Sequence, residues 1–167
     1  YTTTTSFIFE CVLILRKLAQ AIRNLHSIGI VHGDIKMENV MLYKGNPILI
    51  DFDGATRLPC RNQVHLPATP EYMAPEKIQK GKILFANDVW SFGATMYSCF
   101  EGLIPFTRHQ LRTCNTTDTF NPTFTYTPEW IRPLMLQMFT IDYERRPTME
   151  DVLLELQAPS RGEIFEV

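Results

Sequence analysis

Residues 32–39 read His-Gly-Asp-Ile-Lys-Met-Glu-Asn, and residues 51–54 read Asp-Phe-Asp-Gly; these two segments are the most informative part of the sequence. Its chemistry is concentrated in four side chains: Asp34, Lys36, Asn39 and Asp51. Asn39 and Asp51 offer hard oxygen ligands, which suit Mg²⁺ together with substrate phosphates. Asp34 is left to accept a proton from an attacking hydroxyl, and Lys36 can place positive charge on a transferring phosphoryl group.

The segments around this stretch predict a mainly α fold with a small β-hairpin. Apolar residues recur at helical spacing from Cys11 to Ile28, and Gly29 stands where a helix commonly stops. Two β-type runs, 39–43 and 48–52, are joined by a predicted turn at 44–47.

The second half of the chain is predicted to be helical between long loops. Residues 87–101 are apolar nearly all round, which is typical of a buried central helix. Two further helices are expected at 128–139 and 148–157, the latter capped by Thr148 with Asp151 in its first turn. The Pro-rich stretch 54–75 and the Thr- and Pro-rich stretch 113–128 are expected to be loops.

Three later motifs, together with the first stretch, give the sequence a clear resemblance to the protein kinase family. They are Ala-Thr-Pro-Glu-Tyr-Met-Ala-Pro-Glu at 68–76, Asp-Val-Trp-Ser-Phe-Gly at 88–93 and Asp-Tyr-Glu-Arg-Arg-Pro-Thr at 142–148. The resemblance implies that residues 1–167 form the C-terminal lobe of a kinase, with a catalytic loop at 32–39 and an activation segment at 51–76.

The resemblance also implies roles for individual residues and a reaction. Asp34 would be the catalytic base, Lys36 the γ-phosphate contact, and Asn39 and Asp51 the Mg²⁺ ligands. Met41 would lie beneath the adenine of ATP, and Thr69 would belong to the substrate-binding loop. Lys36 and Thr69 resemble the serine/threonine branch, so the implied reaction is transfer from Mg-ATP to a hydroxyl of a protein substrate.

Five residues are implied to support the site. Glu76 would pair with Arg146 in a buried ion pair that attaches the activation segment to the lobe. Asp88, a carboxylate in an apolar helix, would brace the backbone of the catalytic loop. His32 and Phe52 would stack.

Two departures from the family pattern favour a second interpretation. Gly33 replaces the arginine that usually precedes the catalytic aspartate, which puts control by loop phosphorylation in question. Asp53 replaces a glycine and could ligate magnesium or repel the phosphates. With both changes, the two segments resemble those of small-molecule phosphotransferases of the aminoglycoside and choline kinase type. Those enzymes generally lack the platform for peptide substrates that motifs 68–76, 88–93 and 142–148 build, so these motifs favour a protein substrate.

The resemblance covers only part of a kinase domain. No Gly-rich loop, strand lysine or helix glutamate lies upstream of Tyr1, so the N-lobe is expected to be absent from the chain. Two hypotheses follow. The chain belongs to an active kinase, or it is a free-standing lobe that acts as a pseudokinase-like binding module or receives its N-lobe from a partner.

Composition narrows the classes of partner. Of the 167 residues, 45% are hydrophobic and 20% are charged, which excludes a disordered chain. The net charge of −2 shows no basic excess and therefore argues against nucleic acid as the main ligand. The longest apolar run is too short to cross a membrane. The four cysteines form no C-x-x-C pair, and reduced thiols in a cytoplasmic compartment are expected.

Overall fold

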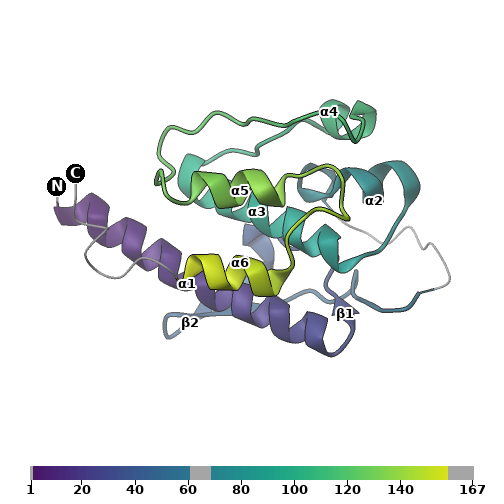
Figure 1. Cartoon of the computed structure of the whole chain (residues 1–167). Helices are drawn as coiled ribbons and strands as arrows, with labels where there is room; N and C mark the ends of the chain where they lie inside the picture. The colour runs from purple at the N-terminus through teal and green to yellow at the C-terminus, as the bar shows by residue number, and fades with distance from the viewer. Residues whose placement is uncertain (1, 61–68, 158–167) are drawn as a thin grey trace.

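Two helices, α1 (Thr2–Ser27) and α3 (Phe85–Glu101), form the frame of the chain (Figure 1). The computed structural model describes residues 2–60 and 69–157, with side chains from residue 6 onward. The described elements confirm the predicted mainly α fold with a small antiparallel sheet. Within the described residues, no helix combines the length and the apolar character needed to span a membrane.

Helix α1 is longer than the sequence predicted at its N-terminal end. It begins at Thr2 instead of Cys11, because no glycine or proline interrupts the preceding residues. It ends at Ser27, where Gly29 adopts a φ of +80° and donates its N–H to the His26 carbonyl at 3.0 Å. Ile28 was predicted to lie on the buried face but is 55% exposed, since it lies beyond the helix end.

The predicted hairpin is present with a shorter turn. Strand β2 (Val40–Tyr43) pairs antiparallel with β3 (Asn46–Leu49). Only Lys44 and Gly45 form the turn, with φ values of +49° and +72°, a conformation typical of two-residue hairpin loops. Pro47 lies inside β3, where its missing N–H is tolerated because the sheet has only two strands.

A second two-stranded ribbon was not predicted. Strand β1 (Ile30–Val31) pairs with β4 (Thr56–Arg57), which lies in the stretch expected to be irregular. This pairing holds the residues just after 51–54 against those just before 32–39. The ribbon therefore brings the two chemically important segments together.

The remaining elements are short. They are η1 (Met37–Asn39), η2 (Pro70–Tyr72), α2 (Pro75–Lys80), α4 (Arg108–Thr113), α5 (Arg132–Met138) and α6 (Met149–Leu156). Helix α5 is shorter than predicted because residues 128–131 form turns before it. Helix α6 lies along α1 (Figure 1), and Thr148 and Asp151 form its predicted N-terminal cap.

Helix α3 is the buried centre of the fold, as predicted. It begins two residues earlier than expected, at Phe85, and ends at Gly102 with a φ of +73°. Helix α5 packs against it at Gly93. A Cβ atom at Gly93 would lie 3.1 Å from Met138 Cβ and 3.1 Å from Phe139 Cε1, so the absence of a side chain sets the distance between these segments.

We expect Gly93→Val to lower the free energy of unfolding by about 1–3 kcal/mol, because the added side chain overfills a close-packed contact. Urea denaturation measures this change. The matched control is Leu154→Val, which also introduces valine into a helix but at a position that is 56% exposed. It should change stability by about 0.5 kcal/mol or less. Equal effects of the two variants would contradict the packing argument.

Candidate active site

Asp34 lies at the centre of a small polar cluster built from two distant segments. Its Oδ1 accepts the backbone N–H of Thr69 at 2.9 Å. Its Oδ2 lies 2.9 Å from Lys36 Nζ and accepts Asn39 Nδ2–H at 3.0 Å. Lys36 Nζ also donates to Thr69 Oγ1 at 2.5 Å. The structure thus brings together four of the residues that the sequence singled out.

These contacts determine the charge of Asp34. Burial of the carboxyl group raises its pKa, but the hydrogen bond from the Thr69 N–H and the contacts with Lys36 lower the pKa by more than burial raises it. The pKa of Asp34 therefore lies below its ordinary value. At neutral pH the group is a carboxylate, the form that can accept a proton.

Asn39 is buried and its amide is oriented by Asp34. Asn39 Nδ2 donates to the Asp34 carbonyl at 2.8 Å as well as to the carboxylate. Both of these bonds use the amide nitrogen, and within the described residues no hydrogen bond is recorded to Asn39 Oδ1. The Asn39 carbonyl accepts the N–H of Ile50 at 3.0 Å, which places Asp51 beside it.

Asp51 is exposed and adopts an unusual backbone conformation. Its φ is +63°, in the left-handed region that aspartate tolerates better than most residues. Its Oδ1 accepts a long hydrogen bond from the Asp53 N–H, at 3.4 Å. Asn39 and Asp51 flank the β2–β3 hairpin, and the hydrogen bond from the Ile50 N–H to the Asn39 carbonyl joins its two ends. No group of three or more His, Cys, Asp or Glu side chains suited to a metal occurs among residues 2–60 and 69–157.

His32 is fully buried and both ring nitrogens are occupied. The Asp34 N–H donates to its Nδ1 at 3.3 Å, so the ring proton is on Nε2, which donates to the Ile50 carbonyl at 3.2 Å. Its ring lies edge-on to Phe52 with centroids 4.8 Å apart. The expected contact between His32 and Phe52 is present, and His32 links the segments that carry Asp34 and Asp51.

Asp88 of α3 fixes the backbone that precedes Asp34. The carboxylate is inaccessible to solvent, and it accepts the N–H groups of His32 at 2.8 Å and Gly33 at 2.9 Å. His26 Nε2 of α1 lies 2.9 Å from the same carboxylate. The bracing contact expected of Asp88 is therefore present, while the contribution of His26 was not foreseen.

Gly33 cannot carry a side chain in this arrangement. Its φ is +84°, and a Cβ atom there would lie 2.7 Å from the backbone carbonyl oxygen of Gly54. Both the backbone conformation and the close approach to Gly54 require glycine. The backbone around Gly33 therefore accommodates glycine and leaves no room for the arginine of the family pattern.

Glu76 and Arg146 form a bidentate ion pair, with oxygen-to-nitrogen distances of 2.8 and 3.0 Å. The two side chains are 4% and 0% exposed. Arg146 also donates to the carbonyls of Thr140 and Ala86, and Asn87 donates to Glu76 at 2.6 Å. The pair expected from the sequence therefore exists, and it attaches α2 to the segment before α6 and to the start of α3.

Met41 lies apart from the polar cluster, on strand β2, where it is 57% exposed. Two residues that contact the cluster or its supports carried no recognisable signal in the sequence. One is Asn87, and the other is Lys77, which donates its Nζ–H to the Gly33 carbonyl at 2.6 Å. Lys77 stands between Glu76 and Ile78 in a short helix, and this local sequence does not distinguish it from an ordinary exposed lysine.

Comparison with known proteins gives the class of the chain. Residues 4–156 match the protein kinase domain, so the chain belongs to the protein kinase family, with the fold of its C-terminal lobe. Smooth-muscle myosin light chain kinase of Gallus gallus is 40% identical over 101 residues, which cover 58% of this chain and 5% of that protein.

Two further relatives are similar over comparable or longer stretches. A probable serine/threonine-protein kinase of Dictyostelium discoideum is 30% identical over 149 residues, 86% of this chain and 30% of the relative. Mitogen-activated protein kinase kinase 10 of Arabidopsis thaliana is 34% identical over 101 residues, 57% of this chain and 33% of the relative. The chain spans a third or less of the length of these curated relatives.

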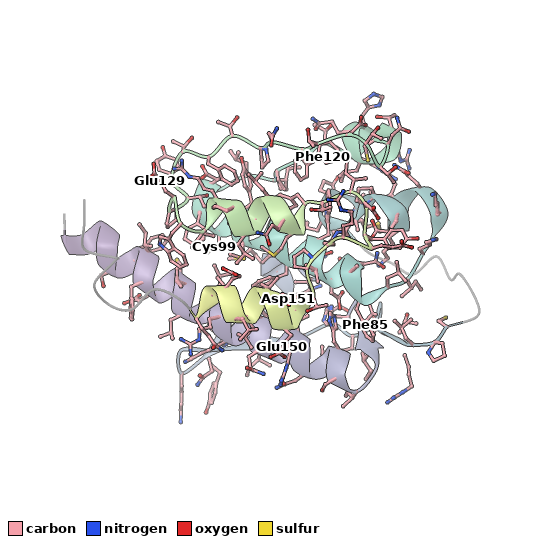
Figure 2. The ribbon with its side chains drawn as sticks, in the orientation of Figure 1. Phe85, Cys99, Phe120, Glu129, Glu150 and Asp151 are labelled. Atoms are coloured by element: carbon pink, nitrogen blue, oxygen red, sulfur yellow. The ribbon has the colours of Figure 1, made fainter. Side chains whose placement is uncertain are left out.

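We expect Glu76→Ala to lower the free energy of unfolding by roughly 3–5 kcal/mol, because it leaves the Arg146 guanidinium buried without its partner. Thermal or urea denaturation measures the loss. The control is Glu150→Ala, at the start of α6 (Figure 2). Glu150 forms an ion pair with Arg23 in which the side chains are 51% and 41% exposed, respectively. This control substitution should cost about 1 kcal/mol or less. An equal loss of unfolding free energy in both variants would contradict the claim that burial makes the Glu76–Arg146 pair costly to break.

Proposed function

We propose that the site around Asp34 transfers the γ-phosphoryl group of Mg-ATP to serine or threonine hydroxyls of protein substrates. The observation that carries this proposal is the environment of Asp34. Its carboxylate is ionised and oriented by three donors, from Thr69, Lys36 and Asn39. Membership of the protein kinase family supports the same reaction.

Each residue of the cluster then has a part in the transfer. Asp34 accepts the proton of the attacking hydroxyl, which approaches on the side of the carboxylate that Thr69 borders. Lys36, already beside Asp34 and Thr69, compensates negative charge on the transferring phosphoryl group. Its contact with Thr69 supports the serine/threonine preference, as does the printed name of the Dictyostelium relative.

The donor atoms of Asn39 and Asp51 fit magnesium. Mg²⁺ is held by one or two protein oxygens together with water and substrate phosphates, so a larger cluster of acidic side chains is not required. Asn39 Oδ1 accepts no hydrogen bond recorded within the described part of the chain, and Asp51 is exposed. Bound there, the ion would neutralise charge on the phosphates of ATP.

The adenine lies over Met41 in this proposal. The hairpin presents four apolar side chains that are 47–60% exposed: Met41, Leu42, Tyr43 and Ile48. Nucleotide and a β-rich lobe, supplied by the same protein or by a partner, would cover them. A cytoplasmic location is also proposed, consistent with Cys11, Cys99 and Cys114 being outside disulfides.

A binding module without transfer activity is the alternative, and Asp53 is the observation that favours it. Asp53 is exposed next to Asp51, so it adds a second negative charge where the phosphates of ATP would lie. Binding of Mg-ATP without phosphoryl transfer would identify this alternative. Phosphorylation of a small molecule in preference to proteins would identify the aminoglycoside-kinase-like alternative.

We expect Asp34→Asn to reduce kcat by about 10²–10⁴-fold in the natural protein that carries this chain, with little change in the KM for ATP. The amide keeps the size of the side chain but cannot accept the proton. Transfer of labelled phosphate from ATP to a mixture of protein substrates measures the effect. Glu155→Gln, an exposed substitution in α6, is the control and should behave like wild type. Undiminished turnover in Asp34→Asn would refute the role of Asp34.

A further inference from the structure

Lys77 occupies the space that a side chain at position 33 would enter. Its Nζ lies 3.4 Å from the place of a Cβ atom on Gly33, and it donates to the Gly33 carbonyl at 2.6 Å. Lys77 comes from α2, more than forty residues further along the chain. A cation therefore lies directly beside the residue that precedes Asp34, although the sequence has glycine there.

The surroundings of Lys77 are unusual for a lysine. Burial lowers its pKa, while the negative charges of Asp88 and Asp34 raise it, with a net pKa below the ordinary value. Lys77 is half-buried, and its ammonium group lies in the field of two carboxylates, Asp88 and Asp34. Lysine is mostly exposed in proteins unless it has such partners.

The hydrogen bond from Lys77 completes the fixation of one peptide group. The peptide bond between Gly33 and Asp34 presents the Gly33 carbonyl on one side and the Asp34 N–H on the other. Lys77 holds the carbonyl, and His32 Nδ1 accepts the N–H at 3.3 Å. Since a peptide group is planar, holding both ends fixes the plane that leads into Asp34. Asn39 Nδ2 holds the next carbonyl, that of Asp34, at 2.8 Å, and together these contacts restrict the direction in which the Asp34 side chain leaves the backbone.

Helix α2 is itself firmly attached. Glu76, the neighbour of Lys77, is held by Arg146 and Asn87. The position of Lys77 is therefore set by a buried ion pair and not by an exposed loop.

From these contacts we propose that Lys77 is a positioning residue for phosphoryl transfer. Lys77 orients Asp34 by holding the Gly33 carbonyl. It also supplies a positive charge from α2 beside position 33, where no charged side chain fits. This inference rests on the proposed function of the site. It adds a residue of helix α2 to the machinery that aligns the base.

The test compares three variants of the natural protein that carries this chain. Lys77→Met keeps the length and apolar stem but removes the charge and the donor. We expect kcat to fall by about tenfold or more, because small displacements of a reacting group are costly, and the KM for ATP to change little. Lys77→Arg keeps charge and donors and should retain kcat within about threefold of wild type. Lys80→Met, the same substitution at an exposed position of α2, should have no effect.

Amide hydrogen exchange at Gly33 and Asp34 provides a readout that needs no turnover. Lys77→Met should speed exchange there by about tenfold, while Lys80→Met and Lys77→Arg leave it unchanged. If wild type transfers no phosphate, the proposed function fails, and the exchange rates still decide whether Lys77 positions this segment. The inference is overturned if Lys77→Met matches Lys80→Met in both kcat and exchange, or if Lys77→Arg is as impaired as Lys77→Met.

Discussion

The buried carboxylate of Asp88 is the constraint on which the site depends. A charge removed from water is tolerated only when several donors surround it, and here they are the backbone N–H groups of His32 and Gly33 and the ring of His26. Two of these donors belong to the chain just before Asp34. The hydrogen bonds that satisfy this one carboxylate of α3 therefore hold the segment before Asp34 against the buried central helix of the fold.

The site is assembled from segments far apart in the sequence, and each junction uses a different interaction. Strand pairing of β1 with β4 joins the segments around residues 30 and 57. A hydrogen bond from the Thr69 N–H connects the segment before α2 to Asp34, and the Glu76–Arg146 pair attaches α2 itself. Because these contacts share neighbours, we expect their energies to be coupled and not additive.

The sequence predicted those parts of the molecule that depend on local pattern. Helices α1, α3 and α6 have long or well-capped apolar faces, and motif spacing identified the cluster around Asp34. It did not predict the β1–β4 ribbon, whose strands have two residues each and pair Ile30 with Arg57 and Val31 with Thr56. Nor did it predict the role of Lys77, since nothing in a lysine's neighbours along the chain reveals that its ammonium group contacts the Gly33 carbonyl.

The close approach of Gly33 to Gly54 has a consequence for how such a chain can change over time. Any side chain at position 33 would meet the Gly54 carbonyl oxygen, 2.7 Å from the first atom added, and would meet the Lys77 ammonium next. Introducing an arginine before Asp34 thus requires movement of the 51–54 segment and displacement of the Lys77 ammonium group at the same time. The glycine is therefore closed to substitution unless its neighbours move, whereas Lys77 can change without creating a clash at position 33.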